Sequence, residues 1–325
     1  MRIVFLGTPD FAATILQGLI DADLTPVAVV SQPDRPQGRK QITVKTPVKA
    51  VAEANDIPVL QPTKIKTKSF ETELAAYEAD FIVTAAYGRI IPDNILALAK
   101  VDALNVHGSL LPKYRGASPV QAALINAEDV TGVTILRMTS ELDAGPIFKT
   151  SEYSIPGDMR SDELMDALAA LGAEILPETL REIYSGNLTP LEQDHEKASE
   201  VGLIDKSMGQ IDWNNSARII EGLVRGLYPW PGAFTYLDGK RFKIHAAKAY
   251  PLNQASEDIT QIENYDDLDN GTVVSIANKS IWVKTGDGVL QLKEIQKDNS
   301  KAMSTTQVYH NYQILEDKFT NTEEY

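Results

Sequence analysis

The sequence contains no cysteine among its 325 residues. This absence excludes disulfide bridges, thiolate zinc sites and cysteine nucleophiles, and it is typical of proteins from a reducing compartment. The sequence also has no stretch of about 18 apolar residues, so we expect no membrane-spanning helix. The apolar run at residues 1–7 is too short for a signal peptide and ends in a glycine turn. We therefore expect a cytoplasmic protein.

Positive charge is scarce, with 31 Lys and Arg residues against 45 Asp and Glu residues and a formal net charge of -14 at pH 7. This balance argues against a nucleic-acid partner, although phosphates respond to the local potential rather than to the total charge. Two stretches without acidic residues nevertheless gather basic ones, namely Arg35, Arg39, Lys40, Lys45 and Lys49 in the first and Lys240, Arg241, Lys243 and Lys248 in the second. Each cluster is either a solvated face or a contact for a nucleic-acid backbone.

The first half of the chain alternates short apolar runs with amphipathic segments. The apolar runs predict strands at residues 3–6, 27–30, 59–60, 81–85 and 103–106, and the segments between them predict helices at 11–20, 47–55, 70–78 and 93–98. This order is typical of an α/β fold, here a Rossmann-like, mostly parallel sheet with helices on both faces. Ligands of such sheets bind beyond the carboxyl ends of the strands.

Two further strands are predicted at residues 133–137 and 147–153, with Asp143 in the loop between them. Ser161 is a good N-cap for the helix that follows. Because proline lacks a backbone N–H and clashes with the preceding turn, we expect Pro177 to divide this helix into two pieces that end near Tyr184.

The second half of the chain is rich in predicted strands. Residues 234–237 and 241–246 flank an Asp238-Gly239 turn, which is a strong hairpin signal, and further strands are expected at 272–276, 281–285 and 289–295. Several short strands in about 85 residues indicate a small barrel or an open sheet, and of these we predict an OB-like β-barrel. We therefore predict a catalytic domain at residues 1–188, a linker at 189–206 and a β-barrel domain at 207–325.

The most informative stretch is residues 105–113, at the end of a predicted core strand. Side chains two residues apart on a strand point to the same side, so Asn105 and His107 face one cavity together while Val106 faces the core. An amide beside an imidazole suits the stabilisation of an oxyanion with transfer of a proton, and Asp143 could orient the histidine. The alternative is a hydrogen-bonded histidine at a strand end and an aspartate that caps a turn.

Residues 105–112 resemble the signature of the folate-dependent formyltransferases, with Asp143 matching their acidic residue. Several other stretches resemble the branch of that family that formylates methionyl-tRNA, namely residues 5–12, 32–36, Arg39, 114–117 and 228–232. The similarity runs in order from residue 1 to about residue 303 and weakens after Met303. It implies the formyltransferase fold, 10-formyltetrahydrofolate as the formyl donor and the α-amino group of methionyl-initiator tRNA as the acceptor.

The resemblance also implies roles for individual residues. Asn105 and His107 would stabilise a tetrahedral intermediate, with Asp143 orienting His107. Part of the folate pocket would be formed by Ser109, Leu110, Leu111 and Pro112. The loop at residues 32–45 would enter the acceptor stem of the tRNA, and the expected contacts with tRNA are Arg39, Lys40, Lys206, Lys240, Arg241 and Lys243. No spacing suggests a metal site, and we expect a monomer.

The sequence is also partly compatible with three other functions. A formyltransferase for a nucleotide-linked amino sugar would carry the same Asn, His and Asp, although the basic loop at residues 35–49 and the segment at residues 228–231 favour tRNA. A nicotinamide-dependent oxidoreductase is disfavoured because Gly7-Thr8-Pro9-Asp10 lacks the G-x-G-x-x-G pattern. A non-catalytic RNA-binding module would leave Asn105, His107 and Asp143 without a role.

Overall fold

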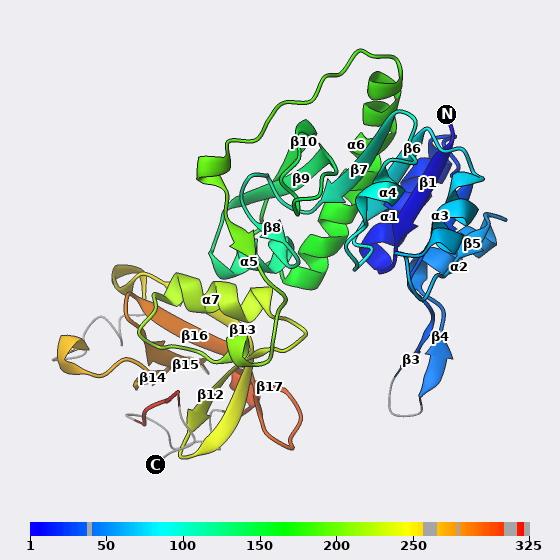
Figure 1. Ribbon diagram of the computed structural model, residues 1–325. Helices are drawn as coiled ribbons and strands as arrows, with labels where there is room; N and C mark the ends of the chain where they lie inside the picture. Colours follow the sequence, from blue (N-terminus) through cyan, green and yellow to red (C-terminus); the bar gives the residue numbers. More distant parts are fainter. Residues whose placement is uncertain (38–40, 256–264, 278–279, 309–316, 322–325) are drawn as a thin grey trace. The chain divides into compact units, whose positions relative to one another are not determined.

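The computed structural model describes residues 1–37, 41–255, 265–277, 280–308 and 317–321. The chain divides into two compact units, and each is built from several stretches of sequence (Figure 1). The first unit comprises Met1–Pro119, Val130–Ser154 and Glu163–Val201, and the second comprises Val120–Asp129, Ile155–Asp162 and Gly202–Tyr325. The expected domain limits at residues 188 and 206 stay predictions.

The first unit is organised around a seven-stranded sheet in the order β10-β9-β7-β6-β1-β2-β5. Its strands are β1 (Ile3–Gly7), β2 (Ala28–Val30), β5 (Val59–Leu60), β6 (Phe81–Ala85), β7 (Asp102–His107), β9 (Val130–Arg137) and β10 (Ile147–Ser154). The five strands from β7 to β5 are parallel, whereas β9 is antiparallel to both β7 and β10. The prediction of a mostly parallel sheet in an α/β fold is therefore confirmed.

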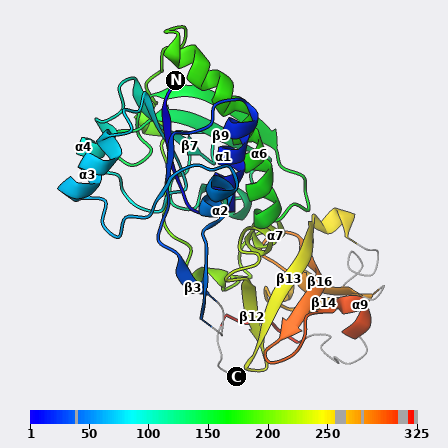
Figure 2. The same cartoon turned by 90° about the vertical axis from the view of Figure 1, so that its right-hand side faces the viewer.

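Helices cover both faces of this sheet. They are α1 (Asp10–Asp21), α2 (Pro47–Ala54), α3 (Lys68–Ala75), α4 (Asp93–Leu96) and α6 (Ser161–Tyr184). Figure 2 shows α3 and α4 on one side of the strands and α6 on the other. A Cβ added to Gly172 of α6 would lie 3.0 Å from Val106 Cγ1, so Val106 faces α6. Because side chains alternate along a strand, Asn105 and His107 point to the opposite side, as predicted.

The prediction that Pro177 divides the last of these helices is wrong. Helix α6 runs without a break over its 24 residues, with Pro177 inside it. Buried leucines on both sides of the proline, Leu164, Leu168, Leu176 and Leu180, attach both halves to the core. Each buried leucine side chain contributes about 1.5–3 kcal/mol to the stability of the fold. Together these contributions outweigh the loss of one helical hydrogen bond at the proline.

Two small strand pairs accompany the main sheet. Strands β3 (Arg35–Gln37) and β4 (Ile42–Val44) form an antiparallel hairpin between β2 and α2. Strand β8 (Arg115–Gly116) follows β7 and pairs in parallel with β11 (Glu200–Val201). A stretch that lies beyond α6 in the sequence therefore returns to the region after β7.

The second unit contains an antiparallel sheet in the order β12-β13-β16-β15-β14, with β17 beside β16. Its strands are β12 (Ala233–Leu237), β13 (Lys240–Tyr250), β14 (Val273–Ala277), β15 (Ser280–Lys284), β16 (Val289–Lys297) and β17 (Met303–Ser304). Asp238 and Gly239 both have positive φ angles, as the tight turn between β12 and β13 requires. The predicted strand-rich domain is confirmed.

Residues 317–320 close this sheet. Thr320 pairs with Tyr236 of β12, while Lys318 pairs with Thr272 just before β14, so the segment joins the two ends of the strand order. Between these pairs, the buried Phe319 stacks on Trp213 at 5.7 Å between ring centroids and meets Phe242 edge-on at 6.3 Å. The closed sheet thus has an aromatic core to which the closing segment itself contributes.

Two helices of the second unit pack closely against each other. They are α5 (Pro119–Ile125) and α7 (Ala217–Gly226), which lie far apart in the sequence. A Cβ on Gly222 would lie 2.3 Å from Leu124 O, and one on Gly226 would lie 3.0 Å from Gln121 O. The two glycines of α7 therefore allow a backbone approach that a larger residue would prevent. Within the described part of the chain, no helix combines the length and apolarity needed to cross a bilayer.

Candidate active site

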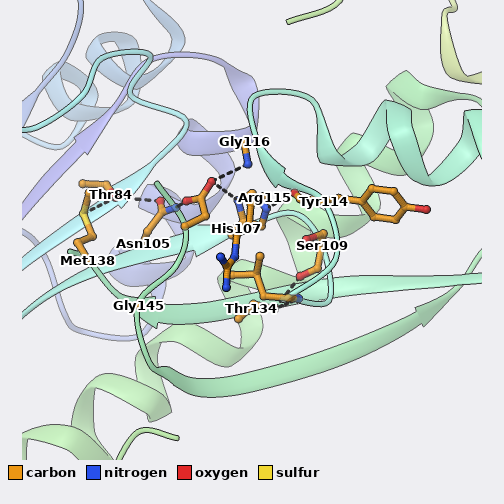
Figure 3. Close-up of polar contacts among 12 residues, drawn as sticks. Thr84, Asn105, His107, Ser109, Tyr114, Arg115, Gly116, Thr134, Met138 and Gly145 are labelled. Carbon is orange, nitrogen blue, oxygen red and sulfur yellow. Dashed lines mark hydrogen bonds and ion pairs between the residues drawn. The ribbon is translucent and has the colours of Figure 1, made fainter. Parts of the chain in front are cut away.

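Asn105, His107 and Asp143 meet in the first unit at the carboxyl end of β7, where the parallel fold predicts a ligand site (Figure 3). Asn105 Nδ2 donates a hydrogen bond to Asp143 Oδ1 at 3.1 Å. His107 Nδ1 lies 3.5 Å from Asp143 Oδ2. The sequence therefore identified three side chains that the fold brings together.

The backbone around Asp143 has an unusual conformation. Asp143 has a φ angle of 51°, in the left-handed region that few residues other than glycine adopt readily. Two residues later, a Cβ on Gly145 would lie only 2.0 Å from Arg137 O, so only glycine fits there. The carboxylate is held from the other side by the N–H of Gly116, which donates to Asp143 Oδ2 at 2.9 Å. The loop thus directs the carboxylate inward rather than to solvent.

Both ring nitrogens of His107 face oxygen acceptors. Nε2 lies 2.9 Å from Tyr114 O, which can only accept, and Nδ1 faces the Asp143 carboxylate. The side chain is 5% exposed, so water does not provide alternative partners. The doubly protonated imidazolium has a donor for each of these acceptors. The geometry therefore places an oxygen acceptor opposite each ring nitrogen of His107.

The orientation of the Asn105 amide is set by β6. Thr84 is the register partner of Asn105, and its hydroxyl donates to Asn105 Oδ1 at 2.9 Å. With its oxygen engaged in this way, the amide directs its NH₂ group toward Asp143. Since an amide NH₂ carries two donors, the bond to Asp143 uses one of them. The second is available to a bound substrate.

The chemistry of the site follows from this convergence. Donors from Asn105 and His107 point at the two oxygens of one carboxylate, and a developing oxyanion presents the same negative oxygen to the same donors. Preorganised donors of this kind are the usual means of stabilising the tetrahedral species of acyl transfer. The described residues offer no cluster of three or more His, Asp and Glu side chains that could hold a metal ion.

The turn after β7 is shaped by Ser109 and Thr134. Ser109 is fully buried, and its hydroxyl donates to Lys113 O at 2.7 Å. Thr134 Oγ1 donates to Ser109 O at 2.7 Å and accepts from the N–H of Leu111 at 3.1 Å. Of the four residues expected in the folate pocket, Leu111 is also buried, whereas Leu110 and Pro112 are half-buried. Ser109 therefore fixes the turn, and Leu110 and Pro112 present apolar surface.

The structure adds residues that the sequence argument missed. Thr84 can be recognised in the sequence as the only polar residue of an otherwise apolar strand. Its hydrogen bond to Asn105 cannot be recognised there, because it depends on how β6 pairs with β7. The buried Arg115 donates to Gln193 Oε1 through Nη2 at 2.7 Å, and Gln193 in turn bonds the backbone around Asp143. No local pattern marks Gln193, because it lies 50 residues from Asp143 in a polar stretch.

The residues expected to contact tRNA are distributed as follows. Arg39 and Lys40 lie outside the described residues. Nearby, Lys49 is bound to Asp34 at 2.7 Å and Lys45 to Glu53 at 2.6 Å, so these two members of the basic cluster have carboxylate partners within the protein. Hydrogen bonds from Lys49 and from Gln61 lower the pKa of Asp34 below its usual value of 3.8.

In the second unit, β12 and β13 carry a cationic and aromatic face. Tyr236 is the register partner of Arg241, and Phe234 that of Lys243, so all four side chains lie on one side of the hairpin. The Arg241 guanidinium lies 3.8 Å above the ring of Phe234. We call these four residues the hairpin face. Lys240 and Lys206 are exposed in the same unit, and Lys206 lies four residues before Gln210, which pairs with Phe234.

Comparison with protein families gives two matches along the chain. Residues 1–180 match the formyl transferase family, and residues 203–313 match the family of the formyl transferase C-terminal domain. The two models together span most of the chain.

Curated proteins resemble the chain over nearly its whole length. The methionyl-tRNA formyltransferase of Acetivibrio thermocellus is 40% identical over 316 residues, which cover 97% of this chain and 98% of the relative. The protein of the same name from Desulfotalea psychrophila is 42% identical over 304 residues, or 94% of this chain and 90% of the relative.

Solved structures share the fold at much lower identity. A sugar 3N-formyl transferase, WlaRD, crystallised in the presence of dTDP and 5-N-formyl-THF, gives a TM-score of 0.63 at 18% identity, covering 93% of this chain and 99% of that chain. HypX from Aquifex aeolicus, in complex with tetrahydrofolic acid, gives 0.57 at 17% identity, covering 95% of this chain and 46% of that chain.

Proposed function

This chain belongs to the methionyl-tRNA formyltransferase family, and on that basis we propose that it transfers a formyl group from 10-formyltetrahydrofolate to the α-amino group of methionyl-initiator tRNA. The observation that carries the proposal is the convergence of Asn105 Nδ2 and His107 Nδ1 on one carboxylate at the end of β7. The relatives named for this activity support the choice of substrates, since their similarity covers almost all of the chain.

The acceptor needs little activation. An α-amino group has a pKa of about 8 in peptides, and esterification of the neighbouring carboxyl group to the tRNA lowers it further, so much of the amine is already the neutral nucleophile at physiological pH. The amine nitrogen forms a bond to the formyl carbon, the formyl oxygen becomes negatively charged, and the bond from that carbon to N10 of the folate then breaks. The proton released by the amine must reach N10. The protein therefore has two tasks, which are to hold the oxyanion and to move this proton.

Asn105 and His107 provide the donors for the first task. The second N–H of the Asn105 amide is the donor for the oxyanion, while Thr84 holds the amide oxygen. His107 is anchored through Nε2 by Tyr114 O at 2.9 Å, and its contact with Asp143 through Nδ1 is longer, at 3.5 Å. Nδ1–H is therefore the donor that can turn from the carboxylate to the oxyanion. Asp143 orients the His107 ring through this contact, and His107 passes a proton to N10 and receives the one that the amine releases.

The formyl donor would bind against the turn after β7. Leu110 and Pro112 present the apolar surface that a flat ring requires, and the buried Ser109 keeps the turn in shape. The solved structures with a tetrahydrofolate ligand share this fold, which supports a folate site in the first unit. When bound, 10-formyltetrahydrofolate supplies the activated one-carbon group.

Binding of the tRNA would use basic residues of both units. Arg39 and Lys40, which lie between β3 and β4 in the sequence, are proposed to contact the acceptor stem. In the second unit we assign the backbone contacts to Lys206, Lys240, Arg241 and Lys243. The hairpin face favours this assignment because Arg241 and Lys243 lie side by side on it, with the buried Phe234 supporting the Arg241 guanidinium, and a phosphate backbone is attracted by such paired cations.

A formylation assay tests the proposed function. The protein is incubated with 10-formyltetrahydrofolate carrying a labelled formyl group and with charged initiator tRNA, charged elongator methionyl-tRNA or a UDP-linked amino sugar. Label should be incorporated into initiator methionyl-tRNA and into neither of the other two. Formylation of the amino sugar alone would contradict the proposal and favour the sugar-modifying branch of the fold.

A further inference from the structure

The stretch that follows α6 is built into the candidate active site. Residues Glu200–Val201 form β11 beside Arg115 and Gly116, and Leu191 pairs with Ile147. Between them, Ser199 Oγ accepts a hydrogen bond from the N–H of Tyr114 at 2.8 Å. Since Tyr114 O is the acceptor for His107, this stretch reaches the site through one of its anchoring groups. A second contact, made by Gln193, is more direct.

Gln193 connects Arg115 to the loop that carries Asp143. Its Nε2 donates to Asp143 O at 2.8 Å and to Gly145 O at 2.7 Å. Its Oε1 accepts from Arg115 Nη2 at 2.7 Å and from Arg115 Nε at 3.2 Å. Gln193 is 6% exposed and Arg115 is 8% exposed, so water does not replace these bonds. Both donors of the Gln193 amide are thus used on two carbonyls of one loop.

The Asp143 loop depends on such support. Glu141 and Leu142 are exposed, and Asp143 itself holds a left-handed φ angle that costs free energy. The Asp143 carboxylate must nevertheless face Asn105 and His107 within hydrogen-bonding distance. Two bonds to the carbonyls of Asp143 and Gly145 fix the backbone on which the carboxylate is mounted. Gln193 is the side chain that bonds both of these carbonyls.

We propose that Gln193 is a positioning residue for Asp143, with Arg115 holding its amide in place. The inference rests on the proposed function, because it gives Gln193 a role only through the carboxylate that acts with His107. The residue type matters. Only an amide provides two N–H donors for the carbonyls together with an oxygen for the guanidinium, whereas a carboxylate at the same place would turn acceptors toward acceptors.

Two substitutions of similar volume test the role. Gln193→Met removes all four bonds, and Gln193→Glu retains the acceptor for Arg115 but loses both donors. Each should lower kcat for formyl transfer by about 10- to 100-fold, because a small misplacement of a reacting group has effects of that order. KM for the folate and for the tRNA should change less than twofold. Leu191→Ala, in the same stretch with its side chain 75% exposed, is the matched control and should retain full activity.

A double-mutant cycle with Asp143→Asn separates positioning from general support of the fold. If Gln193 acts through Asp143, adding Gln193→Met to Asp143→Asn lowers kcat no further. A merely structural role would instead multiply the two losses and would raise KM as well. Thermal unfolding and folate binding, measured on every variant, identify any variant that fails to fold. If Gln193→Met fails to fold, the cycle is measured with Gln193→Glu instead.

The outcomes distinguish the inference from the function on which it rests. Full activity of both Gln193 variants, with Asp143→Asn strongly impaired, overturns the role of Gln193 alone. Multiplicative losses in the cycle do the same. Full activity of Asp143→Asn overturns the proposed site, and the role of Gln193 with it.

Discussion

The two units differ in how they hold their polar groups. In the first unit, Asn105, His107 and Asp143 are largely buried and in contact with one another. Thr84 donates a hydrogen bond to the Asn105 amide oxygen, and Gln193 donates one to the backbone carbonyl of Asp143. In the second unit, the basic residues expected to bind RNA are more open to solvent, with Lys206 and Lys240 exposed and Arg241 and Lys243 half-buried. The comparison separates two requirements. A reaction depends on direction and distance, whereas a phosphate backbone responds mainly to the presence of charge.

The cores of the units differ as well. The sheet of the first unit is covered by helices on both faces and has parallel central strands. The sheet of the second unit is closed by residues 317–320, which bring an aromatic side chain into the core. Substitutions that remove apolar volume should therefore affect folding, and those in the polar site should affect rate. The following four predictions test this division.

The largest effect is expected from Phe319→Ala in the closing segment. Removal of a buried phenylalanine leaves a cavity and should lower the free energy of unfolding by about 3–5 kcal/mol. Phe319 is 1% exposed and contacts two aromatic rings, so the upper part of this range is expected. Urea unfolding followed by tryptophan fluorescence measures the change. Phe319→Leu, which retains most of the volume, should lose less, and equal stability of both variants with the wild type would show that closure contributes nothing.

Asn105→Ala should leave the fold intact and slow the reaction. Loss of one donor to an oxyanion typically lowers kcat by about 100- to 1000-fold, or roughly 3–4 kcal/mol. Single-turnover formylation at saturating substrates reports this step directly. Asn94→Ala, an exposed asparagine of α4 in the same unit, serves as the control. Wild-type kcat for Asn105→Ala would exclude Asn105 from the reaction.

Lys243→Ala on the hairpin face should weaken tRNA binding severalfold without changing kcat at saturating tRNA. Removing one phosphate contact should also reduce the slope of log K against log salt concentration by about 1. Filter binding at several salt concentrations provides both numbers. Lys100→Ala removes one exposed lysine from the first unit and should leave the slope unchanged. If Lys243→Ala and Lys100→Ala gave the same salt-dependence slope, the RNA would bind elsewhere than at this hairpin.

The smallest effect is expected at the base of the β3–β4 hairpin. Because the pKa of Asp34 is lowered in the folded protein, the bond to Lys49 stabilises the fold at neutral pH, and this contribution is lost as the pH falls below 3.8 through the lowered pKa. Lys49→Met should therefore cost at most about 1 kcal/mol at pH 7 and almost nothing well below pH 3.8. Urea unfolding at both pH values tests this. Lys45→Met, at a more exposed pair, should show no measurable change.

Periodicity and turn residues were sufficient to predict most of the fold. The alternation of apolar runs identified all strands of the seven-stranded sheet and β12 to β16 of the second unit, but not β17 or the β3–β4 hairpin. The i, i+2 spacing of Asn105 and His107 predicted that they share a face. These features are local, so each can be recognised within a few residues.

The features that the sequence did not reveal depend on long-range contacts. Gln193 lies in a polar stretch that reads as a linker, and only its return to the Asp143 loop gives it a partner. Residues 317–320 carry a single apolar side chain, which is too little to signal a strand. Pro177 was interpreted from its backbone alone, whereas the buried leucines on both sides of it keep α6 in one piece.

The close packing of α5 against α7 limits how the molecule can be cut or recombined. In the sequence, helix α5 lies between two strands of the first unit, β8 and β9. It nevertheless belongs to the second unit, where its backbone packs closely against the glycines of α7. A chimera that exchanges only the carboxyl-terminal half between relatives would separate surfaces that have adapted to each other. Transplanting the second unit would require that α5 and residues 155–162 be carried along with it.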